Sequence, residues 1–170
     1  MTFGATVFLL SPANCAGTRA QILLNSRTSP LGARLAGEGA PLGEVFTFMS
    51  SLYFRGKLTY AIRFGAPPAD WSGALVIAPG RGLVPADLAI RVTDLRAMAA
   101  VPVDPDNPGF RDPLVRDATA LGRALGSDGR AVLLGSVATE KYVDPLWQVL
   151  GDRLYFPPTF VGRGDMSRGG

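Results

Sequence analysis

The chain has 170 residues, 47% of them hydrophobic, which predicts one domain spanning residues 1–170 with a sizeable buried core. Its net charge is +3, and its 15 arginines and two lysines form no basic run, which argues against nucleic acid and leaves a phosphate-bearing anionic small molecule as the expected partner. The absence of histidine and the single cysteine, Cys15, exclude an internal disulfide, histidine-dependent catalysis and the usual zinc sites, so no metal and no other cofactor is predicted.

The N-terminal stretch has no basic residue and only a short apolar run, which predicts neither a signal peptide nor a membrane span. Together with the single cysteine, which fits a reducing compartment, this indicates a cytoplasmic protein. Residues 5–10 are apolar and stop at Ser11 and Pro12, a pattern typical of a buried parallel strand that enters a loop. A short helix with Thr18 as N-cap is predicted next, and residues 25–40, rich in Ser, Gly and Pro, are predicted to form a surface loop.

Two helices and a second strand are predicted in the next part of the chain. Pro41 suits the first turn of a helix, and a separate helix is predicted over 53–64, beginning near 55–57. The apolar stripe of the first of these helices consists of Leu42, Val45, Met49 and Leu52. Residues 74–78 form a compact apolar run that ends in the glycine loop 79–82, which predicts a second buried strand.

The C-terminal half predicts three more helices and two more strands. A helix is expected over 92–101, with Thr93 or Asp94 near its start, followed by a loop over 102–111. The clearest helix has Asp112 as N-cap, Pro113 at its first position, Gly126 at its end and an apolar stripe of Leu114, Ala118, Leu121 and Leu125. The remaining elements are a strand over 131–134, a helix starting at Thr139 or Asp144 with the stripe Tyr142, Leu146, Val149 and Leu150, and a strand over 154–156.

Strands that alternate with helices predict a three-layer Rossmann-like α/β domain with a mostly parallel sheet of four or more strands, because each parallel return needs a long connection. We expect 5–10, 74–78 and 131–134 to be parallel neighbours, so that the loops after them share the carboxyl edge, where ligands bind in such sheets.

Polar and glycine residues follow these strands and indicate recognition of a phosphate or carboxylate. The predicted ligand-binding residues are Ser11, Asn14, Arg55, Arg81, Gly82, Ser136, Thr139 and Arg163. The loops lack both the spacing of a dinucleotide fingerprint and that of a P-loop, and turns that require positive φ also explain their glycines.

The predicted catalytic residues are Lys57, Lys141 and Asp165. An amine has a tunable pKa that a guanidinium lacks, and each lysine lies near a tyrosine in a chain that otherwise uses arginine, although chance also explains this. Arg163 is interpreted as a clamp on the ligand and Asp165 as its orienter or as a general base, with a solvated terminal loop as the alternative. Ser11, Ser136 and Cys15 are conceivable nucleophiles without an activating neighbour in sequence, and a buried cysteine is more often a small hydrophobic residue.

The order of these segments resembles that of uncharacterised bacterial α/β proteins with similar loops after their strands. The segments that carry the resemblance are Leu10-Ser11-Pro12, Tyr53-Phe54-Arg55-Gly56-Lys57, Ile77-Ala78-Pro79-Gly80-Arg81-Gly82-Leu83-Val84, Gly135-Ser136, Tyr142-Val143-Asp144-Pro145-Leu146 and Phe160-Val161-Gly162-Arg163-Gly164. The resemblance implies a Rossmann-like fold and no particular activity. The chain departs from it at Pro-Gly-Arg-Gly-Leu, where a histidine-glycine-leucine is expected, so no shared imidazole chemistry follows.

Three functional hypotheses remain open from the sequence. The leading one is an enzyme that acts on a nucleotide, a nucleoside or another phosphorylated small molecule, by hydrolysis or glycosyl transfer. The second is a non-catalytic nucleotide- or anion-sensing module at the same edge of the sheet. The third is a structural or protein-interaction domain whose glycines are only turns.

Overall fold

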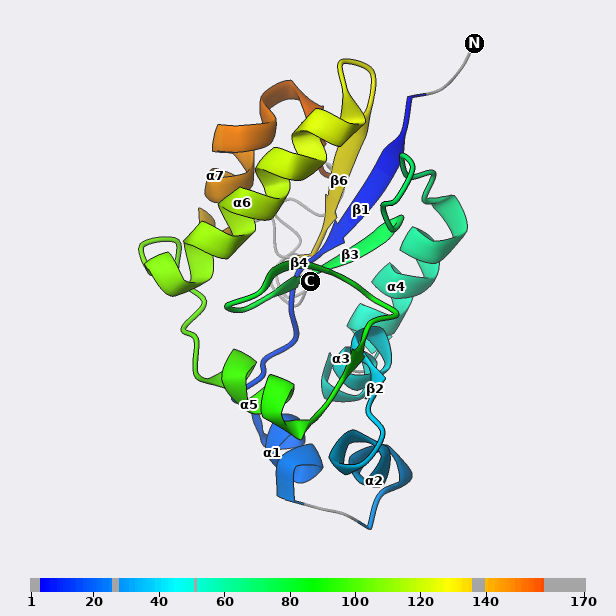
Figure 1. Cartoon of the computed structure of the whole chain (residues 1–170), viewed down its shortest axis with the longest axis vertical. Helices are drawn as coiled ribbons and strands as arrows, with labels where there is room; N and C mark the ends of the chain where they lie inside the picture. Colours follow the sequence, from blue (N-terminus) through cyan, green and yellow to red (C-terminus); the bar gives the residue numbers. More distant parts are fainter. Residues whose placement is uncertain (1–3, 26–27, 51, 136–139, 158–170) are drawn as a thin grey trace.

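The fold of this chain, taken from a computed structural model, is a mixed α/β fold with one main sheet (Figure 1). The structure describes residues 4–25, 28–50, 52–135 and 140–157. The sheet has the strand order β4-β3-β1-β6-β7. Its strands are β1 (Thr6–Leu10), β3 (Ala74–Ala78), β4 (Gly82–Pro85), β6 (Arg130–Leu134) and β7 (Leu154–Tyr155). All are parallel except β4, which forms an antiparallel hairpin with β3.

The three strands predicted to be parallel neighbours are confirmed as such. Leu10 of β1 lies beside Val76 of β3 on one side and beside Leu134 of β6 on the other. The chain continuing from these strands therefore starts at one shared edge of the sheet, and this edge carries the candidate site.

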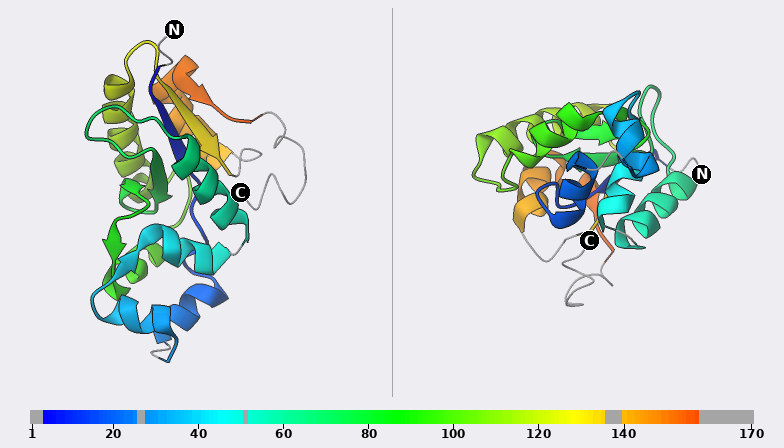
Figure 2. Two further views of the ribbon diagram at one scale, coloured as in Figure 1. Left: turned by 90° about the vertical axis from the view of Figure 1, so that its right-hand side faces the viewer. Right: turned by 90° about the horizontal axis from the view of Figure 1, so that it is seen from below.

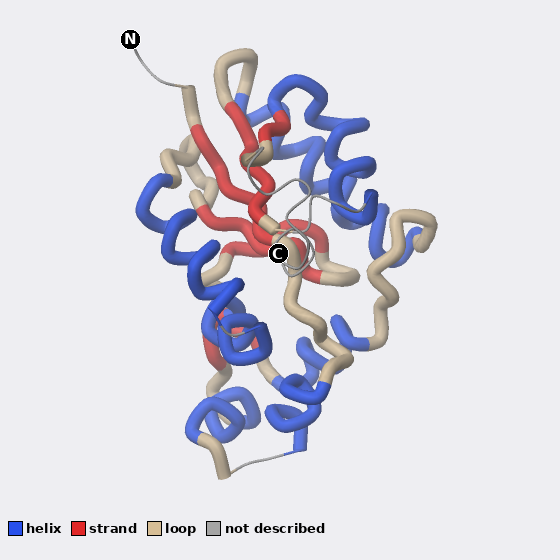
Figure 3. Tube along the Cα trace, turned by 180° about the vertical axis from the view of Figure 1, so that it is seen from behind, coloured by secondary structure: helices blue, strands red, loops and turns tan. Residues whose placement is uncertain are grey.

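Helices pack against both faces of the sheet, as expected for β1 and β3, which are buried along their whole length (Figures 2 and 3). Val7 and Leu9 of β1 belong to the core under α6 (Pro108–Leu125) and α7 (Glu140–Leu150). Phe8 belongs to the opposite core, which includes Phe54 and Ala61 of α4 (Leu52–Phe64). The left view of Figure 2 shows α4 and α6 on opposite sides of the strands.

The remaining helices gather beyond the carboxyl edge instead of stacking on the sheet faces (Figure 1). They are α1 (Thr18–Asn25), α2 (Pro30–Ala36), α3 (Leu42–Ser50) and α5 (Val92–Ala99), together with the short pair β2 (Ala40–Pro41) and β5 (Ala89–Ile90). A mixed α/β fold with a mostly parallel sheet is thus established, while the three-layer Rossmann-like arrangement stays a prediction.

The prediction of a loop over 25–40 is wrong, because this segment contains α2 and the start of β2. Ser29 is the N-cap of α2: its side chain accepts a hydrogen bond from the backbone N of Gly32 at 3.0 Å, and Pro30 follows at the first helical position. A serine-proline pair therefore starts a helix inside a segment whose overall composition is typical of a loop.

Two separate helices, α3 and α4, confirm the prediction for residues 41–64, but the second begins at Leu52 and not near 55–57. Leu52 is also not part of a buried stripe, since it is 76% exposed. The glycine at position 56 does not delay the helix, because it costs only about 1 kcal/mol relative to alanine.

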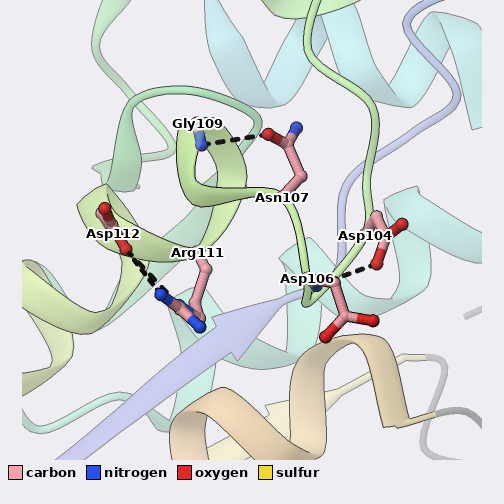
Figure 4. Close-up of polar contacts among 6 residues, drawn as sticks. All are labelled: Asp104, Asp106, Asn107, Gly109, Arg111 and Asp112. Atoms are coloured by element: carbon pink, nitrogen blue, oxygen red, sulfur yellow. Dashed lines mark hydrogen bonds and ion pairs between the residues drawn. The ribbon is translucent and has the colours of Figure 1, made fainter.

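Helix α6 begins earlier than predicted, at a different N-cap residue. Asn107 is the N-cap and accepts a hydrogen bond from Gly109 N at 3.1 Å, so Pro113 lies inside the helix (Figure 4). The Asp112 carboxylate contacts the Arg111 guanidinium instead of capping a helix. Two pairs of a capping residue and a proline could begin this helix, Asn107-Pro108 and Asp112-Pro113. The helix begins at the earlier pair, because its additional first turn buries Phe110. The four stripe residues Leu114, Ala118, Leu121 and Leu125 are buried as predicted.

The C-terminal elements are close to those predicted. Helix α7 begins at Glu140, so Asp144 is interior to it, and Thr139 lies outside the described residues. The strand β4 was missed, and β7 comprises two residues. None of the described helices combines the length and the apolar character needed to cross a membrane.

Candidate functional site

The carboxyl ends of β1 and β6 lie where the chain changes direction across the sheet. From β1 the chain goes to β3 on one side, and it later returns to β6 on the other side of β1. Ser11 and Gly135 directly follow these two strands, and Ser11 N donates a hydrogen bond to the Leu134 carbonyl at 3.1 Å. Ligands bind at such switch points in open α/β sheets, because the connections diverge there and leave a crevice.

Helix α4 brings a lysine to this point. The Lys57 ammonium group donates a hydrogen bond from Nζ to Ser11 Oγ over 2.9 Å, although the two residues are 46 positions apart in sequence. Ser11 itself is only 2% exposed. The contact joins two of the predicted site residues, one assigned to ligand binding and one to catalysis.

Gly135 completes the cluster because no larger residue fits there. A Cβ at this position would lie 1.9 Å from Ser11 Oγ and 3.2 Å from Lys57 Nζ. Its φ of +134° is also a conformation that other residues rarely adopt. Glycine is required here for the close approach of the β6 end to the amine and the hydroxyl.

Burial shifts the protonation of the amine. Desolvation lowers the pKa of Lys57 from 10.5 to about 7, because the charged form loses hydration that its surroundings do not replace. The ring of Phe54 lies 5.4 Å from Nζ, and within the described part of the chain no carboxylate forms an ion pair with this amine. At neutral pH, Lys57 can therefore both release and take up a proton.

Lys57 also lines a cavity of about 650 Å³ between α4 and the β6–β7 side of the sheet. The described lining residues are Thr6, Phe8, Gly56, Lys57, Tyr60, Phe64, Arg130, Val132, Leu134, Tyr155 and Pro157. They include two cationic side chains and four aromatic rings, and none of them is a carboxylate. The cavity thus combines flat apolar surface with positive charge.

Arg130 is the second cation of this cavity, and it is not among the site residues predicted from the sequence. It opens β6, pairs in register with Thr6 and donates from Nε to Thr6 Oγ1 at 3.0 Å. Arg130 and Leu134, the first and last residues of β6, both line the cavity, which therefore extends along the strand by roughly 13 Å. An arginine at the start of a strand carries no local signal, because its relation to Lys57 depends on how α4 packs.

Two of the predicted ligand-binding residues have structural partners elsewhere. The Arg81 guanidinium forms an ion pair with Asp94 of α5. Gly82 has a φ of +82°, and a Cβ there would lie 2.2 Å from the Asp117 carboxylate, so tight packing against α6 explains this glycine.

The other described candidates also lie apart from the amine. The Asn14 side chain accepts a hydrogen bond from Ala16 N at 3.1 Å, Arg55 is exposed on α4 and Lys141 is exposed on α7. Neither these three nor Arg81 and Gly82 are among the described lining residues of the 650 Å³ cavity, and their binding or catalytic roles stay predictions. Ser136, Thr139, Arg163 and Asp165 lie outside the described residues.

Cys15 is buried, and burial raises the pKa of its thiol to about 12. Because only the thiolate is a strong nucleophile, this thiol is unreactive at neutral pH. Burial likewise raises the pKa of Tyr142 to about 12. Among the described residues, no three Cys, Asp or Glu side chains gather into a group that could hold a metal ion.

Comparison with known proteins gives no relative from which a function could be transferred. No protein-family model, no curated protein and no solved structure matches the chain, so the resemblance to bacterial α/β proteins stays a prediction.

Proposed function

We propose that the protein is an enzyme that acts on a nucleotide, a nucleoside or another phosphorylated small molecule bound in the Lys57 cavity. The observation that carries this proposal is the Lys57 amine, which Ser11 holds at 2.9 Å at the switch point of the sheet and which lines a cavity of about 650 Å³. Titratable groups that have a perturbed pKa and lie in a cleft are found more often at functional sites than elsewhere.

The lining of the cavity favours a ligand with a planar ring and a negative charge. Phe8, Tyr60, Phe64 and Tyr155 offer rings against which a base can stack. A phosphate can bind at Lys57 or at Arg130, since none of the described lining residues of this cavity is a carboxylate. A nucleotide or an elongated sugar phosphate matches this combination better than a purely apolar ligand does.

The protonation behaviour of Lys57 favours an enzyme over a simple binding module. A pKa of about 7 lets the amine act as general acid and as general base at neutral pH. Hydrolysis and glycosyl transfer both need a group that activates the attacking oxygen and a group that protonates the leaving group, and a titrating amine can supply either step. In the Rossmann-like arrangement that we propose for the sheet, ligands bind at the carboxyl edge, which is where Lys57 contacts Ser11.

Two alternative functions remain. A sensing module would bind the same ligands without converting them. A protein-interaction domain is favoured by exposed apolar side chains on α4, where Leu52 is 76% and Ile62 68% exposed. The single cysteine supports our proposal of a cytoplasmic location for any of these functions.

The proposal is tested by thermal-shift measurements with nucleotides, nucleosides and sugar phosphates, followed by phosphorus NMR for turnover. A ligand present at 100 times its Kd should stabilise the protein by about 2.7 kcal/mol. Lys57→Ala and Arg130→Ala should each weaken the binding, whereas the matched control Lys141→Ala should leave it unchanged. Binding without turnover would favour the sensing module, and no shift with any of these compounds would refute the proposed function.

A further inference from the structure

We propose that the Lys57 amine forms a covalent imine with a carbonyl carbon of its substrate, which makes the substrate class a phosphorylated aldehyde or ketone, such as a sugar phosphate in its open-chain form. This inference rests on the proposed function, because it names the substrate chemistry of the same cavity.

The geometry leaves the amine available for attack. Its observed polar partner, Ser11 Oγ, is neutral, so no carboxylate within the described residues fixes Lys57 as a paired ammonium. Gly135 has no side chain to cover Nζ, and Lys57 forms part of the cavity wall. A lysine desolvated in an apolar pocket is one of the usual forms of an activated amine nucleophile.

Desolvation favours the neutral form of the amine, because no carboxylate among the described residues pairs with it. The amine faces the Ser11 hydroxyl from β1, the Phe54 ring from its own helix and Gly135 from the end of β6. Tyr60, Arg130 and Tyr155 are the other described titratable groups that line the cavity. With a pKa of about 7, about half of the amine is neutral at pH 7, against roughly one part in 3,000 for an ordinary lysine.

The proposed step balances without any further reactant. The nitrogen lone pair of neutral Lys57 attacks the carbonyl carbon as the carbonyl π bond breaks, and one N–H proton passes from the nitrogen to the oxygen to give the carbinolamine. The C–O bond then breaks, and the hydroxyl leaves as water with the second N–H proton to give the imine. Addition of water later reverses the sequence and releases the amine. The phosphate of the substrate would be held by a cation of the cavity, as in the proposed function.

Ser11 acts in this scheme as a positioning residue. Its hydroxyl is buried and accepts the hydrogen bond from Nζ. It therefore orients the amine and is itself poorly placed to attack a substrate. The alternative is that Ser11 is the nucleophile and Lys57 its base, as in Ser–Lys pairs. The two roles differ in one observable property: a positioning serine can be removed without moving the site of covalent attachment.

The experiment uses pyridoxal 5′-phosphate, which combines an aldehyde, a planar ring and a phosphate, and traps the imine with borohydride at neutral pH. Peptide mapping is simple because the chain has only two lysines, Lys57 and Lys141, besides its N-terminal amine. We expect Lys57 to be labelled at least about tenfold faster than Lys141, because the rate follows the neutral fraction of the amine. Lys57→Arg should abolish this fast labelling, Lys141→Arg should not, and Ser11→Ala should keep labelling at Lys57 at a lower rate.

Equal labelling of Lys57 and Lys141 would overturn the imine proposal, as would loss of all fast labelling in Ser11→Ala with a correctly folded protein. Pyridoxal, which lacks the phosphate, separates this result from the proposed function. If Lys57 reacts equally fast with both aldehydes and no nucleotide or sugar phosphate binds, the imine stands and the phosphorylated substrate class is wrong. If nucleotides or sugar phosphates bind while Lys57 is not trapped, the proposed function stands and the imine is wrong.

Discussion

Replacing Lys57 by methionine should change the pH dependence of stability in a direction that the structure fixes. The folded-state pKa of about 7 is below the ordinary value of 10.5, so between these pH values the unfolded chain holds a proton that the folded chain has released. Unfolding then takes up a proton, and the stability of the wild type rises with pH across this window. Below about pH 7 the folded protein carries the buried ammonium and its full desolvation cost.

The size of the effect follows from the two pKa values. From about pH 6 to about pH 9, the wild type should gain on the order of 2 to 3 kcal/mol relative to Lys57→Met, since a shift of one pKa unit corresponds to about 1.4 kcal/mol. The upper end assumes the whole shift, and the half-buried position of the side chain favours the lower end. Methionine suits the test because it keeps an apolar stem of similar length without a charge.

The assay is urea unfolding of both proteins at several pH values, with the difference in unfolding free energy plotted against pH. Taking the difference removes the ionisation of other groups, including the Cys15 thiol, whose raised pKa makes the folded protein less stable at high pH in both proteins. Lys141→Met, on an exposed lysine, is the control and should give a flat difference. A flat difference for Lys57→Met as well would show that the amine is hydrated and would remove the proton-transfer group from the proposed mechanism.

Three further predictions concern neighbouring features. Gly135→Ala should lower stability by about 1–3 kcal/mol and weaken ligand binding, because the added Cβ would clash with the Ser11 hydroxyl that holds the amine. Gly56→Ala adds a Cβ with no atom within 4 Å, so it should stabilise the protein by up to about 1 kcal/mol through α4. Both effects are measured by the same urea unfolding. Asn107→Ala should cost about 1 kcal/mol by removing the cap of α6, as measured by thermal unfolding. Lys57→Arg should destabilise the protein, whereas Lys141→Arg should not, and equal unfolding midpoints for the two variants would contradict the burial argument.

The sheet could be predicted from sequence because its central strands consist almost entirely of apolar residues. Residues 74–78 are buried at every position, so their hydrophobic run is distinct from any amphipathic helix. Parallel pairing with β1 followed from the long connections between the strands, which exclude simple hairpins.

The elements that were missed depend on contacts across the chain. The strand β4 is the four-residue segment Gly82–Pro85, too short for a periodicity, and it pairs with β3 through a tight turn. Helix α2 has the local signal of the Ser29 cap, but it lies in a segment whose serines, glycines and prolines are equally typical of a loop. The composition of this segment therefore led to the prediction of a loop, although the capping signal of a helix was also present in it.

The site could be predicted in part. Ser11 follows from its place after a buried strand, and Lys57 follows from the rarity of lysine in an arginine-rich chain. Their hydrogen bond could not be predicted, because it exists only once α4 packs across β1. Arg130 could not be predicted as a site residue, because the cavity that it shares with Lys57 forms only when α4 packs over the β1 and β6 strands.

The presence of a lysine at position 57, in a chain with 15 arginines, has a physical explanation in the burial of its end group. A guanidinium stays charged at any pH at which proteins fold, so an arginine in this place would keep the full cost of burying a charge without a carboxylate beside it. An amine escapes much of that cost by losing its proton, and the hydroxyl of Ser11 can hydrogen-bond to the neutral amine as well as to the ammonium. The same burial that makes lysine the tolerable cation here also lowers its pKa into the neutral range, so stability and reactivity have a single cause at this residue.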